Sequence, residues 1–155
     1  MNLSYGKQYI DKSDEKFILK SIYDTKITDG KQVKLFENKL KKKLKSKYCI
    51  SCNSATSGLL LSLKSIGVKK NDIIIMPAVN FVASYSTSTL LGAKIVLCDV
   101  DKITGQITPE TVENCIKSNK LKKIKALITM YLGGYPNNVH NFFNLKKRYN
   151  FFIIE

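Results

Sequence analysis

Apolar and polar positions follow two patterns along the chain: short apolar runs and longer amphipathic stretches. The short runs predict strands at 48–52, 73–76, 94–99, 124–131 and 151–155. The longer stretches carry apolar residues at helical spacing, and they predict helices at 13–23, 32–47, 55–66, 81–91, 138–149 and from Thr108-Pro109-Glu110 onward. Strands that alternate with helices indicate an α/β fold, a mostly parallel sheet with helices on both faces.

In such a sheet, ligands bind beyond the carboxyl ends of the strands. The connections expected there are 53–57, 77–81, 99–101 and 132–136. The first places small and hydroxyl residues at a helix start, where N–H groups and the helix dipole favour a phosphate. Serine and threonine are also ordinary N-caps, so the segment fits a structural cap or a phosphate site. Phe81 likewise fits either a platform for a planar ring or a core position.

Glycine-rich nucleotide motifs are missing from the sequence. Neither G-x-x-x-x-G-K-[ST] nor G-x-G-x-x-G occurs in it, so a P-loop and a Rossmann dinucleotide site both lack support.

Length and hydropathy narrow the class of protein. The chain has 155 residues, of which 44% are apolar, enough to build a core and too many for a disordered chain. No apolar run approaches the roughly 20 residues of a membrane span, so we expect no membrane partner. Residues 1–10 have no apolar h-region of a secretory signal, which favours a cytoplasmic location.

The net charge is only a weak indicator of a nucleic-acid partner. The sequence holds 26 Lys and Arg against 12 Asp and Glu, a net charge of +14, and Arg148 is its one arginine. A basic nucleic-acid-binding α/β domain therefore stays open as an alternative, although nucleic-acid recognition relies strongly on arginine. The dense lysines of 39–47 are expected on the solvated face of an amphipathic helix whose apolar face carries Val33, Phe36, Leu40 and Leu44.

The cysteines and the one histidine do not suggest a metal or redox site. Cys49 and Cys52 fall in a predicted strand, whose two faces would separate their side chains. No second C-x-x-C accompanies this one and His140 is the one histidine, so no four-ligand zinc site is expected. All four cysteines, Cys98 and Cys115 included, are predicted to be buried free thiols, and His140 is predicted to lie on the surface.

Several short motifs occur in a fixed order through the whole chain. They are Tyr5-Gly6-Lys7, Thr28-Asp29-Gly30, Asn53-Ser54-Ala55-Thr56-Ser57-Gly58, Pro77 to Ser84, Asp99-Val100-Asp101, Gly133-Gly134-Tyr135-Pro136 and Phe152-Ile153-Ile154-Glu155. This ordered set resembles the N-terminal part of the DegT/DnrJ/StrS-type sugar aminotransferases, which are fold-type I enzymes dependent on pyridoxal 5'-phosphate.

The resemblance implies roles for particular residues. It implies that Ala55 and Thr56 hold the cofactor phosphate and that Phe81 stacks on the pyridine ring. It places Tyr5 and the turn of Thr28, Asp29 and Gly30 near a nucleotide-sugar substrate, in an active site shared by two subunits of a homodimer.

The resemblance also implies a domain division and a missing part. Residues 1–30 would form an N-terminal helix and substrate-side turn, and 31–155 part of the large cofactor-binding domain. No catalytic residue is expected among the 155, because the Asp that pairs with the pyridine nitrogen and the Schiff-base lysine would follow Glu155. We therefore expect the chain alone to be inactive.

Two alternatives within this resemblance stay open. The expected activity is transfer of an amino group from an amino acid to a nucleotide-linked keto sugar, in surface polysaccharide or lipopolysaccharide biosynthesis. A deoxysugar dehydratase of the same family would use pyridoxamine phosphate and a histidine in place of the lysine. Tyr131 stands where the family often has histidine, which leaves the substrate side undetermined. Outside the family, a stand-alone partner-binding domain is a further possibility.

Overall fold

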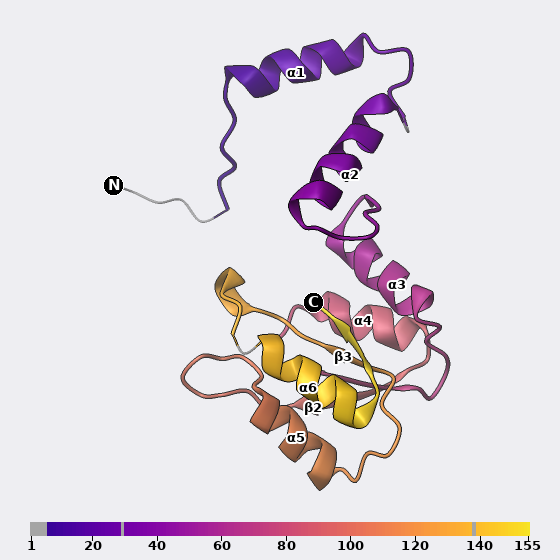
Figure 1. The fold of residues 1–155 in the computed structure, drawn as a ribbon, viewed down its shortest axis with the longest axis vertical. Coiled ribbons are helices and arrows are strands. Elements are labelled where there is room, and N and C mark those ends of the chain that lie inside the picture. The colour runs from indigo at the N-terminus through magenta and orange to yellow at the C-terminus, as the bar shows by residue number, and fades with distance from the viewer. Residues whose placement is uncertain (1–5, 29, 138) are drawn as a thin grey trace. The chain divides into compact units, whose positions relative to one another are not determined.

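The computed structural model describes residues 6–28, 30–137 and 139–155. The chain divides into two compact units, Met1–Ser51 and Cys52–Glu155 (Figure 1).

The first unit contains two helices, α1 (Lys12–Ile22) and α2 (Lys31–Lys43). α1 begins after Asp11, whose carboxylate accepts hydrogen bonds from the N–H groups of Ser13 and Asp14 in a capping box. No residue of either helix is fully buried. On the predicted apolar face of α2, Val33 and Leu40 are half-buried and Phe36 is exposed, and the lysines of the helix are exposed as expected.

The predicted strand at 48–52 is wrong. These residues form no strand, because a strand needs a neighbouring backbone to bond with, and none pairs with them in the described part of the chain. Ser51 instead donates its N–H and hydroxyl to the Glu37 carboxylate, at 2.7 and 2.8 Å. These two bonds hold the segment against α2 and lower the pKa of Glu37.

Without that strand, the argument about its two cysteines also fails. Cys52 is exposed and Cys49 half-buried, so the prediction of burial is wrong for this pair. Cys98 and Cys115 are buried as predicted, and all four are free thiols.

The second unit is a four-stranded parallel sheet of order β2-β1-β3-β4, as the α/β prediction requires. Its strands are β1 (Ile73–Pro77), β2 (Lys94–Cys98), β3 (Ala126–Ile128) and β4 (Phe152–Ile154). Its helices are α3 (Ala55–Ser65), α4 (Val82–Leu90), α5 (Pro109–Ser118) and α6 (Val139–Tyr149), with a 3-10 turn η1 (Leu132–Gly134).

The central strands β1 and β3 are buried on both faces, which explains why they are continuously apolar. Neighbouring residues of β1 point to opposite sides: Ile74 joins Leu63 of α3 in one cluster, whereas Ile75 joins Val112 of α5 and Phe142 of α6 in the other. Helices therefore cover both faces, as predicted.

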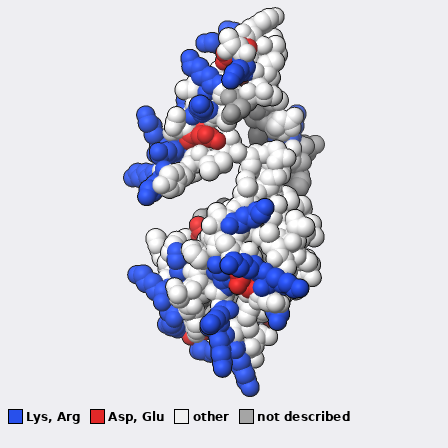
Figure 2. Space-filling view, turned by 90° about the vertical axis from the view of Figure 1, so that its right-hand side faces the viewer, with Lys and Arg blue, Asp and Glu red and all other residues white. Residues whose placement is uncertain are grey.

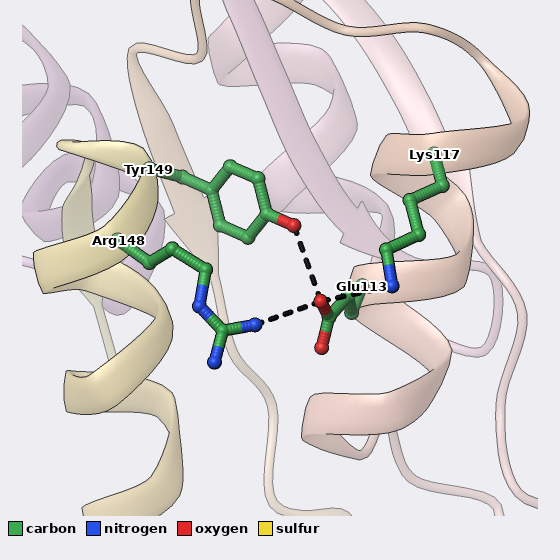
Figure 3. A network of polar contacts seen from close by, with 4 residues as sticks. All are labelled: Glu113, Lys117, Arg148 and Tyr149. Carbon is green, nitrogen blue, oxygen red and sulfur yellow. Dashed lines mark hydrogen bonds and ion pairs between the residues drawn. The ribbon is translucent and has the colours of Figure 1, made fainter.

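A polar cluster on the surface ties α5 to α6 (Figure 3). The Glu113 carboxylate accepts hydrogen bonds from Arg148 at 2.7 Å and Tyr149 at 3.3 Å, and pairs with Lys117 at 3.0 Å. The bond from Lys117, with the two positive charges, lowers the pKa of Glu113. The cluster spans 36 positions of sequence and fixes the two helices side by side.

Candidate functional site

The carboxyl ends of the four parallel strands meet at one edge of the sheet, where ligands bind in open α/β folds. Helices α3 and α4 begin at this edge, because α3 leads into β1, α4 follows it, and both run antiparallel to it. We call it the carboxyl edge. The opposite edge, where the strands begin, is the amino edge.

The start of α3 offers donors at the carboxyl edge. Ser54 is the N-cap: its hydroxyl accepts the Ser57 N–H at 3.2 Å, and its carbonyl accepts the Gly58 N–H at 3.0 Å. The N–H groups of Ala55 and Thr56 then have no acceptor among the described residues, as is normal for a first turn. Ser54 therefore serves as the cap, while Ala55 and Thr56 leave two N–H donors and an exposed hydroxyl for an anion.

Phe81 follows β1 and precedes α4 as its N-cap residue. It is 70% exposed, so the alternative of a core position is wrong. An exposed ring directly after a strand's carboxyl end is available to stack on a planar ligand.

Asn80, next to Phe81, is a candidate that the sequence did not single out. Its Oδ1 accepts the Ser84 hydroxyl at 3.3 Å, whereas its buried Nδ2 has no partner among the described residues. A buried amide donor without a partner is uncommon and suits a ligand oxygen. The one sequence signal was an amide directly before an aromatic residue in a connection already expected at this edge.

A second group lies where β3 and β4 end. The Tyr131 hydroxyl donates to the Glu155 carboxylate at 2.8 Å, and the Thr129 hydroxyl to the Ile154 carbonyl at 3.4 Å. Burial, together with the bond to Glu155, raises the pKa of Tyr131.

Gln106 also went unnoticed in the sequence. Its Nε2 donates to the Tyr135 carbonyl at 3.1 Å, which ties the connection after β2 to the one after β3. Its Oε1 is buried without a partner among the described residues. A contact across 29 positions of sequence leaves no local signal.

The remaining predicted site residues belong to the other unit. Gly30 is the N-cap of α2 and buried, and a Cβ there would collide with the Lys26 carbonyl, so this position requires glycine. Thr28 is exposed. Tyr5 and Asp29 lie outside the described residues. The structure thus gathers Ala55, Thr56 and Phe81 at one edge of the second unit, whereas Thr28 and Gly30 belong to the first unit.

Two other expectations concern metals and membranes. Among residues 6–28, 30–137 and 139–155, no group of three or more His, Cys, Asp or Glu side chains is arranged to hold a metal ion. Within the same ranges, no helix has the length and apolar character to cross a membrane. His140 is exposed, which confirms its predicted surface position.

Comparison with known proteins identifies the class and then the family. The fold is that of the aminotransferases: Spr1654 of Streptococcus pneumoniae, a candidate sugar aminotransferase in its PLP form, matches with a TM-score of 0.86 and 26% identity over 100% of this chain. The family model of the DegT/DnrJ/EryC1/StrS aminotransferase family matches residues 8–155, and the chain belongs to that family.

Two further proteins are similar to this chain. The aminotransferase TlmJ of Streptoalloteichus hindustanus is 27% identical, with a TM-score of 0.68 over 80% of this chain and 33% of its own. An uncharacterized protein of Methanocaldococcus jannaschii, MJ1066, is 33% identical over 129 residues, which are 83% of this chain. The chain spans 32% of the length of MJ1066 and 39% of that of Spr1654.

Proposed function

We propose that this chain is the N-terminal part of a pyridoxal-phosphate-dependent aminotransferase that acts on a nucleotide-linked keto sugar. The observation that carries the proposal is that two features occur at the same edge of the sheet: the N–H groups of Ala55 and Thr56, which have no acceptor among the described residues, and the exposed ring of Phe81. The known PLP and PMP forms of Spr1654 support this choice of cofactor.

The residues at the carboxyl edge suit the chemical groups of this cofactor. Ala55 and Thr56 would bind its phosphate through two N–H groups and one hydroxyl at the positive end of α3, and hydrogen bonds to a charged group each contribute about 1.5–3 kcal/mol. Phe81 would hold the pyridine ring by stacking and exclude water from one face. When bound, pyridoxal phosphate supplies an electron sink for the amino donor's α-carbon.

Asn80 adds a donor to this set. Its Nδ2 would donate to an oxygen of the bound ring or phosphate, which would satisfy an amide nitrogen that has no partner among the described residues. The bond from Ser84 to its Oδ1 leaves the buried Nδ2 as the end of the amide that has no partner among the described residues.

The substrate side remains a proposal drawn from the resemblance. Tyr5, Thr28, Asp29 and Gly30 would bind the nucleotide sugar, with residues 1–30 forming a substrate-side segment and 31–155 part of the large domain. The whole protein would work as a cytoplasmic homodimer in the synthesis of surface polysaccharide or lipopolysaccharide, with an amino acid such as glutamate as donor.

Cofactor binding by the 155-residue chain can be tested by NMR titration of isotope-labelled protein with pyridoxal phosphate and, separately, with pyridoxal. We expect the amides of Ala55 and Thr56 and the Phe81 ring to shift with pyridoxal phosphate, and the two amides to shift much less with pyridoxal. Thr56→Val should weaken binding about tenfold or more, because it removes one hydrogen bond to a charged group. Thr89→Val, an exposed threonine at the far end of α4, is the matched control.

Shifts that are equal for the two compounds, or that avoid α3, would contradict the phosphate site. Borohydride reduction followed by mass spectrometry tests whether any lysine of this chain forms a Schiff base with the cofactor. We expect no specific covalent adduct, since none of the lysines of this chain is assigned to bind the cofactor. One lysine modified stoichiometrically would overturn that assignment.

A further inference from the structure

Charge in the second unit is separated between the two edges of the sheet. Of the 13 basic residues in Cys52–Glu155, 12 lie at or next to the amino edge. We call these 12 the amino-edge patch: Lys64, Lys69, Lys70, Lys94, Lys117, Lys120, Lys122, Lys123, Lys125, Lys146, Lys147 and Arg148. In the lower part of Figure 2, the body formed by this unit, blue side chains crowd one face with little red between them.

Acidic residues follow the opposite distribution. Four of the six in this unit, Asp99, Asp101, Glu110 and Glu155, lie toward the carboxyl edge, where Lys102 is the remaining basic residue. The two others are already engaged: Asp72 accepts the Lys69 N–H at 2.8 Å, and Glu113 pairs with Lys117 and Arg148. Ten lysines of the patch thus form no ion pair with any described residue.

Helix dipoles do not account for the patch. Lysines in the last turn of a helix stabilise its C-terminus, as Lys64, Lys117 and Lys146 do here. Seven lysines of the patch belong to no helix, however. Lys94 is the first residue of β2, and the other six lie in the connections that lead into the strands: Lys69, Lys70, Lys120, Lys122, Lys123 and Lys125. A compositional excess of lysine would not by itself place them all at one edge.

We propose that the amino-edge patch binds the surface of an anionic lipid bilayer. This departs from the expectation of no membrane partner, which rested on the absence of a membrane-spanning run and does not bear on surface binding. Clustered lysines are attracted to such a surface without specific geometry, each contributing about fivefold to partitioning. Leu90, 73% exposed at the last residue of α4, adds an apolar contact at the same edge.

A nucleic acid fits this patch less well. Its one guanidinium, Arg148, is held by Glu113 at 2.7 Å, and the Phe152 ring lies under the Lys125 ammonium, 5.7 Å from the ring centroid. Base recognition and base stacking use free guanidinium groups and free aromatic faces. A bilayer surface needs neither.

The charge separation also sets an orientation. Because the amino edge would contact the bilayer, the opposite carboxyl edge, with residues such as Phe81, would face the aqueous phase. The enzyme would lie on the bilayer without inserting a segment, with its cofactor edge open to soluble ligands. This inference does not depend on which reaction the protein catalyses.

The test is co-sedimentation of the 155-residue chain with vesicles of phosphatidylcholine containing about one third phosphatidylglycerol, compared with pure phosphatidylcholine. We expect binding to the anionic vesicles alone, abolished at about 0.5 M NaCl where charges are screened. The amino-edge variant Lys69→Gln, Lys122→Gln, Lys123→Gln, Lys147→Gln should bind about 10²- to 10³-fold more weakly. These four side chains are exposed and form no ion pair with described residues.

A variant with the same net charge serves as the control. Lys39→Gln, Lys41→Gln, Lys42→Gln, Lys43→Gln removes four exposed lysines of α2, in the other unit, and should weaken binding by less than about fivefold. Lys→Arg at the four amino-edge positions should retain binding, which separates loss of charge from loss of folding. Circular dichroism checks that each variant is folded.

Several results would overturn the proposal. Equal losses in the two glutamine variants would show that total charge matters and the patch does not. Equal binding to neutral vesicles would exclude an electrostatic surface. Tighter binding to a single-stranded RNA at the same salt, lost in the amino-edge variant, would identify a nucleic acid as the partner instead.

Discussion

Leu63 holds α3, and with it the donors of Ala55 and Thr56, against the sheet. It is fully buried, in a cluster with Ile74, Met76 and Ile128, so truncation would leave a cavity between helix and sheet. Replacing a fully buried leucine by alanine costs about 2–5 kcal/mol, from lost apolar burial and the residual cavity. We therefore expect Leu63→Ala to lower the free energy of unfolding by about 3 kcal/mol.

Leu61 in the same helix is the matched control. It is 51% exposed, and alanine has a slightly better helix propensity, so Leu61→Ala should change the free energy of unfolding by less than about 1 kcal/mol. Urea unfolding followed by circular dichroism measures both, with an unchanged dependence on denaturant as the sign that two-state behaviour holds.

The comparison between the two variants tests whether α3 packs on the sheet through Leu63. If Leu63→Ala loses no more than Leu61→Ala, α3 does not pack on the sheet as described. If Leu63→Ala does not fold at all, Leu63→Met supplies the measurement, because it nearly conserves volume and should cost less than about 1.5 kcal/mol.

Two further predictions concern ionisable groups. Burial raises the pKa of Cys98 to about 12, so at pH 8 an aromatic disulfide reagent should label exposed Cys52 and reach Cys98 only on unfolding; equal rates would contradict its burial. The bond from Lys117 holds the pKa of Glu113 below its usual range, so its contribution is full above its unfolded-state pKa and lost as pH falls through the lower folded-state value. Glu113→Gln should therefore lose less stability than the native chain between about pH 5 and pH 3 in urea titrations, and equally steep losses would refute the role of the cluster.

Local chemistry made some elements predictable to within a residue. Thr108 caps α5 through a bond to the Thr111 N–H, and Pro109 supplies the first helical position. Both effects act within one turn, so the sequence contains all that they need. The apolar run of β1 was equally clear, because a strand buried on both faces has no polar positions.

Elements that depend on a distant partner were less predictable. Residues 48–52 have the composition of a strand, yet they bond to α2 through Glu37. β3 is limited to Ala126–Ile128, within the longer run predicted at 124–131. Strand formation requires a neighbouring backbone, and nothing in a local pattern states whether one is present.

The candidate site divides in the same way. The sequence by itself determined the α/β class, the start of α3 at Ala55, and Phe81 after a strand, because each follows from spacing, capping and turn residues close together in the chain. Only the tertiary structure decided that the Asn80 Nδ2 has no partner among the described residues, that Gln106 reaches Tyr135, and that 12 basic residues collect at one edge. Burial and surface charge are sums over segments far apart in sequence, which only the folded sheet brings together.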